Sequence, residues 1–177
     1  MHLQVSNPDP HKVTRLSEDT IPSVKGEWYN YRSVFTPMRP LGYLMKCKAN
    51  KDRPLCFVEE NDGVDITFVF DEEVVQVCSP DSEHSLKMMA GRVDPKTLKK
   101  VNFVQTSLTK VQFDAIRIGK DVVSLLTVCQ SGSVANCLLV TKGIILAIKT
   151  QAGIYCLMRA TEVNPHKVCF DACHILL

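Results

Sequence analysis

The stretch GIYCLMRATEVNPHKVCFDACHILL, residues 153–177, contains two apolar runs separated by Asn164-Pro165, a dipeptide typical of turns. The second run alternates with a period of two, as expected of a β-strand. This alternation assigns two sets of side chains to opposite faces of the strand: Val168, Phe170, Ala172 and His174, and Cys169, Asp171, Cys173 and Ile175. We therefore expect a hairpin whose second strand closes a sheet.

Further runs of strand character precede this hairpin, and turn signals such as Gly119-Lys120 and Ser131-Gly132 separate them. From residue 101 on they are VNFVQ (101–105), KVQFDAIRI (110–118), DVVSLLTVC (121–129), VANCLLVT (134–141) and GIILAIKT (143–150). Earlier in the chain they are LGYLMKCK (41–48), GVDITFVF (63–70) and EVVQVC (73–78). The pattern predicts a mostly β fold, an antiparallel meander that forms a barrel or a sandwich.

One short helix is predicted between these strands, near residues 80–90. In SPDSEHSLKMMAG, residues 79–91, Ser79 can cap the helix, Pro80 suits its first position, and Gly91 fits the position after its end. A helix of about three turns is expected here.

The chain divides into an arm and a domain. Residues 1–26 contain Pro8, Pro10 and Pro22 and lack apolar periodicity, which predicts a flexible N-terminal arm. Residues 27–177 are expected to form a single β-rich domain, because the 177-residue chain with 45% hydrophobic and 23% charged residues has an ordinary globular composition.

Charge is distributed unevenly along the chain. Residues 59–83 carry nine acidic residues and no Lys or Arg, a segment charge of −9, whereas residues 87–120 carry eight basic and two acidic residues, a charge of +6. Either the two segments neutralise each other within the fold, or they form separate faces that steer partners. On the second interpretation, an acidic partner-binding face comprises Glu59, Glu60, Asp62, Asp71, Glu72 and Glu73, and a basic surface comprises Lys96, Lys99 and Lys100.

Chemistry-bearing motifs are scarce. The chain contains no phosphate-binding loop, dinucleotide-binding fingerprint, zinc-protease helix, EF-hand or hydrolase nucleophile elbow. The thiols of Cys129, Cys169 and Cys173, with a histidine as base, remain an alternative centre for a Cys/His-dependent or metal-dependent enzyme. On one strand, however, Cys169 and Cys173 would lie about 13 Å apart, too far to share a zinc ion. No metal or cofactor is therefore predicted.

The eight cysteines of the chain also bear on the compartment. The N-terminus lacks the pattern of a secretory signal, so a reducing cytoplasm and free thiols are expected. Six of them lie singly in apolar runs and are expected to be core residues: Cys47, Cys56, Cys78, Cys129, Cys137 and Cys156. The apolar run 134–148 is interrupted by polar residues and is too short for a transmembrane helix.

The leading functional interpretation is a non-enzymatic structural or interaction protein. It would assemble with itself and with a larger protein partner through opposite-charge surfaces, as small viral matrix or coat proteins do; this analogy is one of class only. The alternatives are a nucleic-acid or anionic-membrane binding module that uses the basic segment 87–120, and the thiol- or metal-dependent enzyme.

Overall fold

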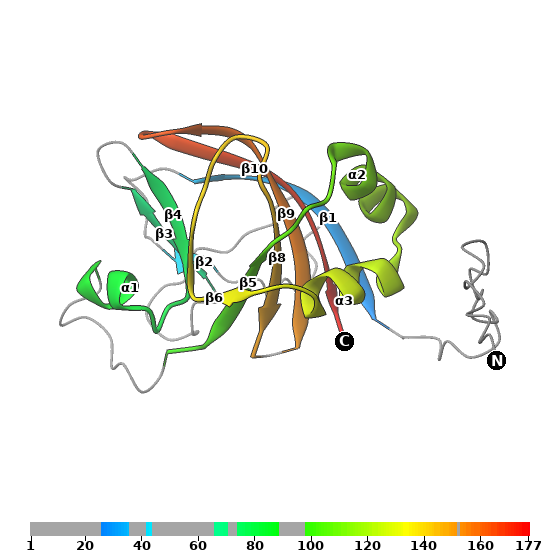
Figure 1. Ribbon diagram of the computed structural model, residues 1–177, viewed down its shortest axis with the longest axis horizontal. Coiled ribbons are helices and arrows are strands. Elements are labelled where there is room, and N and C mark those ends of the chain that lie inside the picture. Colours follow the sequence, from blue (N-terminus) through cyan, green and yellow to red (C-terminus); the bar gives the residue numbers. More distant parts are fainter. Residues whose placement is uncertain (1–25, 36–41, 44–65, 71–73, 89–97, 152) are drawn as a thin grey trace, which may run out of the picture.

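The structure, a computed structural model, is described for residues 26–35, 42–43, 66–70, 74–88, 98–151 and 153–177. Across these residues the fold is mostly β, with two antiparallel sheets and three helices (Figure 1), so the predicted fold class is confirmed, and the sheets pack as a sandwich. Residues 1–25 of the predicted arm lie outside the described residues. The single domain over 27–177 stays a prediction.

The larger sheet has six strands and holds the predicted C-terminal hairpin at its centre. β9 and β10 pair on either side of residues Pro165 and His166, which confirms the turn expected at Asn164-Pro165. Every neighbouring pair in this sheet is antiparallel. The order is β1 (Glu27–Phe35), β10 (Lys167–Leu176), β9 (Ile154–Asn164), β8 (Ile145–Thr150), β5 (Val101–Gln105) and β6 (Val134–Ala135).

The smaller sheet packs against one face of the larger sheet. Phe68 of the smaller sheet lies 5.5 Å, between ring centroids, from Phe170 of the larger one, and both are buried in one core cluster with Val168 and Ala172. These three residues of β10 share the face that the alternation predicts. The order of the smaller sheet is β2 (Gly42–Tyr43), β3 (Ile66–Phe70), β4 (Val75–Cys78) and β7 (Cys137–Leu139).

Two helices replace two predicted strands. KVQFDAIRI forms α2 (Lys110–Gly119) and DVVSLLTVC forms α3 (Val122–Gln130). Thr109 and Gln112 form a reciprocal capping box at the start of α2, and the Asp121 side chain caps α3 by accepting a hydrogen bond from the Ser124 backbone N–H. The strand predictions for 110–118 and 121–129 are therefore wrong, because local caps and burial at helical spacing decide these segments.

These helices cover the other face of the larger sheet, remote from the smaller sheet (Figure 1). Phe113 of α2 and Leu125 of α3 are fully buried in a second core cluster with Cys173 and Ile175 of β10. Both faces of β10 are thus buried, one by the smaller sheet and one by the helices. The molecule is consequently a three-layer arrangement of sheet, sheet and helices.

The helix predicted near residues 80–90 is present as α1 (Glu83–Met88). Its cap differs from the prediction, since Ser82, not Ser79, accepts the hydrogen bond from the Ser85 backbone N–H (3.2 Å). Ser79 is instead buried, and its Oγ accepts a hydrogen bond from the Val101 backbone N–H (3.0 Å), which ties the end of β4 to the start of β5.

Cys78 and Cys137 form a disulfide, which corrects the prediction that both are free thiols. They lie directly opposite each other on β4 and β7, with their Cα atoms 4.1 Å apart. This pairing joins positions 59 residues apart and leaves no local signal in the sequence. Cys129 and Cys156 are buried free cysteines, as predicted, and Cys47 and Cys56 lie outside the described residues.

Candidate functional site

The predicted basic segment is divided by the fold. Lys99 and Lys100 directly precede β5, and Lys96 lies outside the described residues. Farther along the segment, Lys110 forms an ion pair with Asp114 on α2, and the Arg117 guanidinium lies 5.9 Å from the centre of the Phe113 ring. The basic residues of 87–120 that the structure describes are therefore distributed over α1, the start of β5 and α2 with its C-terminal end.

A groove of about 350 Å³ lies beside the start of β5, and we call it the basic groove. It combines the predicted Lys100 with a second cation, Lys149 at the end of β8, because Asn102 of β5 is the direct register partner of Lys149. None of its lining residues is acidic. They are Lys100, Asn102, Lys149, Thr150, Gln151 and Gly153.

Sequence reasoning missed Lys149. It is the only charged residue in GIILAIKT, and a lone cation near the end of an apolar strand is the signal that would have identified it. Its position beside Asn102 depends on the pairing of β5 with β8, which sequence periodicity does not define.

The two lysines of the basic groove are exposed and oriented by their neighbours. The Lys149 ammonium lies 5.6 Å from the centre of the Tyr155 ring on the adjacent strand β9, a cation–π contact. The Lys100 backbone N–H donates a long hydrogen bond (3.5 Å) to Gln151 Oε1 in the turn before β9. Within the described ranges, no carboxylate lies within ion-pair distance of either lysine.

The predicted acidic face lies outside the described residues. In the chain, Glu59, Glu60 and Asp62 precede β3, whereas Asp71, Glu72 and Glu73 belong to the connection from β3 to β4. The six residues of the predicted acidic face therefore form two groups in the chain, which the strand β3 separates.

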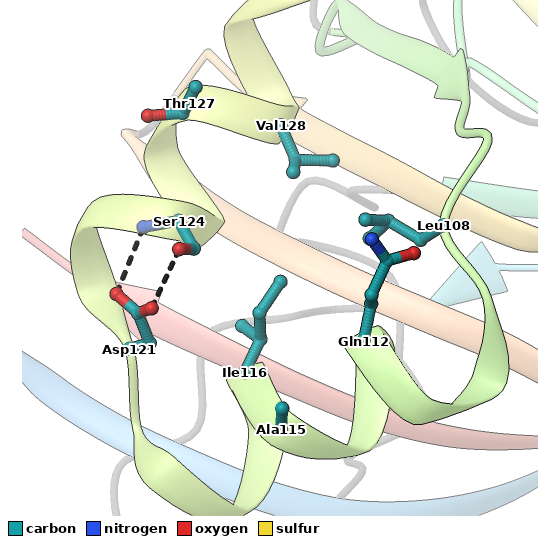
Figure 2. A pocket seen from close by; sticks show the side chains of 8 residues that line it. All are labelled: Leu108, Gln112, Ala115, Ile116, Asp121, Ser124, Thr127 and Val128. Carbon is teal, nitrogen blue, oxygen red and sulfur yellow. Dashed lines mark hydrogen bonds between the residues drawn. The ribbon is translucent and has the colours of Figure 1, made fainter. Parts of the chain in front are cut away.

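A second groove, of about 380 Å³, opens between α2 and α3. Leu108, Ile116 and Val128 supply apolar side chains, while Asp121 is occupied by hydrogen bonds to the backbone and hydroxyl of Ser124 (Figure 2). Beside it, α2 presents Val111 and Ile118, which are 77% and 73% exposed. This apolar surface suits protein contact, but its charges do not indicate which partner covers it.

The candidate nucleophilic cysteines lie in environments that favour the neutral thiol. Burial raises the pKa of Cys129 to about 11 and that of Cys173 to about 12, and it also raises the pKa of Cys169. Because the thiolate is the reactive form, none of these three is activated at neutral pH. Cys129 also lies in the last turn of α3, not at the end of the strand predicted for residues 121–129. The alternative of a Cys/His-dependent enzyme gains no support from them.

His174 is the buried histidine of the C-terminal hairpin. Its Nδ1 lies 3.2 Å from the Tyr31 hydroxyl, its ring stacks on Tyr29 at 4.8 Å between centroids, and Cys156 is its register partner on β9. Burial lowers the pKa of His174 to about 4, so the ring is neutral at physiological pH. The arrangement stabilises the interface of β1, β10 and β9 and exposes no base to a substrate.

We expect the low pKa of His174 to make the protein less stable in acid. Between pH 6.5 and about 4 the unfolded state binds a proton that the folded state does not, so the free energy of unfolding falls as the pH falls, by about 3 kcal/mol in total. Urea unfolding over this range should show a steeper pH dependence for the wild type than for His174→Asn. The exposed His166→Asn variant serves as the control. If His174→Asn kept the pH dependence of the wild type, His174 would not be the group that makes the fold less stable in acid.

Within the described ranges, no group of three or more His, Cys, Asp or Glu side chains is placed to hold a metal ion. Nor is any helix of these ranges long and apolar enough to cross a membrane. No protein-family model, curated protein or solved structure matches the chain.

Proposed function

We propose that the protein is a non-enzymatic interaction protein that assembles with itself and with a larger protein partner, and that the basic groove is one of its contact sites. A single observation carries the proposal: Lys100 and Lys149 are exposed together at a groove that has no acidic lining residue. Such a site attracts a carboxylate-bearing or otherwise anionic partner.

The energetics favour reversible contacts. An exposed ion pair contributes about 0.2–1 kcal/mol, so two lysines give a weak contact that depends on salt and on additional pairs. This strength suits assembly from many copies, in which each contact is weak and their sum is strong.

The alternative of nucleic-acid or anionic-membrane binding uses the same lysines. A surface that binds single strands by stacking presents several aromatic rings beside its cations, whereas here one ring, Tyr155, lies beside Lys149 and none is among the lining residues of the basic groove. We therefore place a protein partner first, and an oligonucleotide or an anionic vesicle serves as the competing ligand in binding assays.

The predicted cytoplasmic location is kept as a proposal with its own test. A reducing compartment breaks accessible disulfides, whereas an oxidising one preserves them. The protein is isolated from its native source, and its free thiols are titrated under denaturing conditions. Their number distinguishes a reducing from an oxidising compartment. A reduced Cys78 and Cys137 would support the cytoplasm, and an intact bond would contradict it.

The interaction proposal predicts salt-sensitive association that depends on two lysines. Lys100→Gln/Lys149→Gln should weaken the association by about tenfold, since two exposed charge pairs are lost. Association of the wild type should also weaken as salt shortens the screening length from about 30 Å at 0.01 M to about 8 Å at 0.15 M. Sedimentation velocity over a range of protein concentrations measures both effects.

The matched control is Lys87→Gln/Lys142→Gln, which removes the same charge from two exposed lysines outside the groove. It should associate like the wild type. A wild-type protein that stays monomeric at low salt and high concentration, and binds no acidic protein, would refute the proposed function.

A further inference from the structure

The acidic connection from β3 to β4 and the basic groove belong to opposite ends of β4. At one end, Val75 pairs with Phe70, and the chain between them contains Asp71, Glu72 and Glu73. At the other end, Ser79 follows β4 and is hydrogen-bonded to Val101, the residue next to Lys100. From residue 75 to residue 79 the strand direction covers about 13 Å. The end of β4 that follows the acidic connection and the end that is tied to the start of β5 are therefore about 13 Å apart.

Figure 1 shows where the elements that form the basic groove meet. β5 begins and β8 ends at the lower edge of the molecule, where the turn into β9 also lies. The basic groove is built from these three segments. It is formed by two strands of the larger sheet and the turn before β9, whereas the acidic connection joins two strands of the smaller sheet.

The charges at the two ends are opposite in sign. The connection carries three consecutive carboxylates, and Val74, its last residue, is 38% exposed. Lys100 and Lys149 line the groove, and both are exposed. A groove of about 350 Å³ has room for a few side chains, not for a folded domain.

We propose, as a consequence of the interaction function above, that the basic groove binds the Asp71–Glu73 connection of a second copy. Because the two surfaces differ and lie at opposite ends of β4, the contact is heterologous and joins copies head to tail. The groove offers lysines and no arginine fork, and its one neighbouring aromatic ring, Tyr155, lies beside Lys149 and is not among the lining residues. These features favour carboxylates of a polypeptide over a nucleic acid.

The test is a charge swap between the two surfaces, followed by sedimentation velocity at low salt. Lys100→Glu/Lys149→Glu reverses the groove, and Glu72→Lys/Glu73→Lys reverses the connection. We expect each double variant to associate at least about tenfold more weakly than the wild type, because like charges then face each other. The variant with all four substitutions should regain most of the association, since the complementary charges are restored.

Controls separate this inference from the proposed function. Lys87→Glu/Lys142→Glu applies the same charge reversal elsewhere and should leave association unchanged, and far-UV circular dichroism of each variant checks folding. If reversing the connection has no effect while reversing the groove abolishes association, the second-copy inference fails and the interaction function stands. If the wild type is monomeric but binds a single-stranded oligonucleotide through the same lysines, the inference is likewise overturned. If neither reversal changes association, both proposals fail.

Discussion

Replacing Cys78 and Cys137 together by alanine is expected to lower the free energy of unfolding by about 4 kcal/mol. The bond links positions 59 residues apart, and without it the unfolded chain regains the freedom that this long closed loop removes. The effect is large because a domain of this size is stabilised by only about 5–15 kcal/mol in total.

The folded state adds a local effect to this loss. β7 has three residues and pairs with β4 at the end of the smaller sheet, so the disulfide joins a short edge strand to its neighbour. The backbone hydrogen bond from Ser79 N–H to Asn136 O (2.7 Å) lies next to the disulfide in the chain. It depends on the same alignment of β4 with β7. Hydrogen exchange in residues 137–139 should therefore increase more than exchange in the central strands of the larger sheet.

Urea unfolding of wild type and variant, each with and without a dithiol reductant, measures the difference. The reductant should destabilise the wild type by a similar amount and leave Cys78→Ala/Cys137→Ala unaffected. Cys129→Ala, which removes a buried free thiol, should keep its sensitivity to the reductant. Equal stability of the wild type with and without reductant would show that this bond does not stabilise the fold.

The C-terminal hairpin illustrates what the sequence predicts well. Its two-residue period and its Asn164-Pro165 turn are local features, and the structure confirms both the turn and the two faces of β10. Alternation does not reveal, however, that both faces are buried. That depends on which layers pack against the strand, and those layers come from distant parts of the chain.

The basic groove shows the corresponding limit for the candidate site. Lys99 and Lys100 are recognisable in the sequence because they form part of a run of positive charge. Lys149 joins them only through the pairing of β5 with β8, in which Asn102 meets a residue 47 positions later. A site built across strands is therefore only half predictable from segments taken one at a time.

Residues 110–130 show a different kind of error, since the decisive signals were local. Thr109 and Gln112 have the spacing of a capping box, and Asp121 stands three residues before Ser124 as a helix cap does. The apolar and β-branched residues that follow also suit strands. Composition alone therefore favours strands here, whereas the capping residues indicate helices. Side-chain burial then separates the two possibilities, because helix and strand place different residues on the same face.

The last prediction uses that difference. Phe113→Ala is expected to lower the free energy of unfolding by about 3–5 kcal/mol, because Phe113 is fully buried between α2 and the larger sheet. Val111→Ala is the matched control, with an expected change within about 0.5 kcal/mol, since Val111 is 77% exposed on the opposite side of the helix.

If residues 110–119 formed a strand, the two variants would lose similar amounts of stability. Residues 111 and 113 would then share one face, and truncating either side chain would remove contacts from the same layer. Urea unfolding of the two variants thus distinguishes a helix from a strand by the ratio of the two losses in free energy of unfolding. This ratio is insensitive to the overall stability of the protein. Comparable losses in Val111→Ala and Phe113→Ala would contradict the helical assignment of 110–119. A large loss in Phe113→Ala alone would show that the helix layer is bound to the sheet through this side chain.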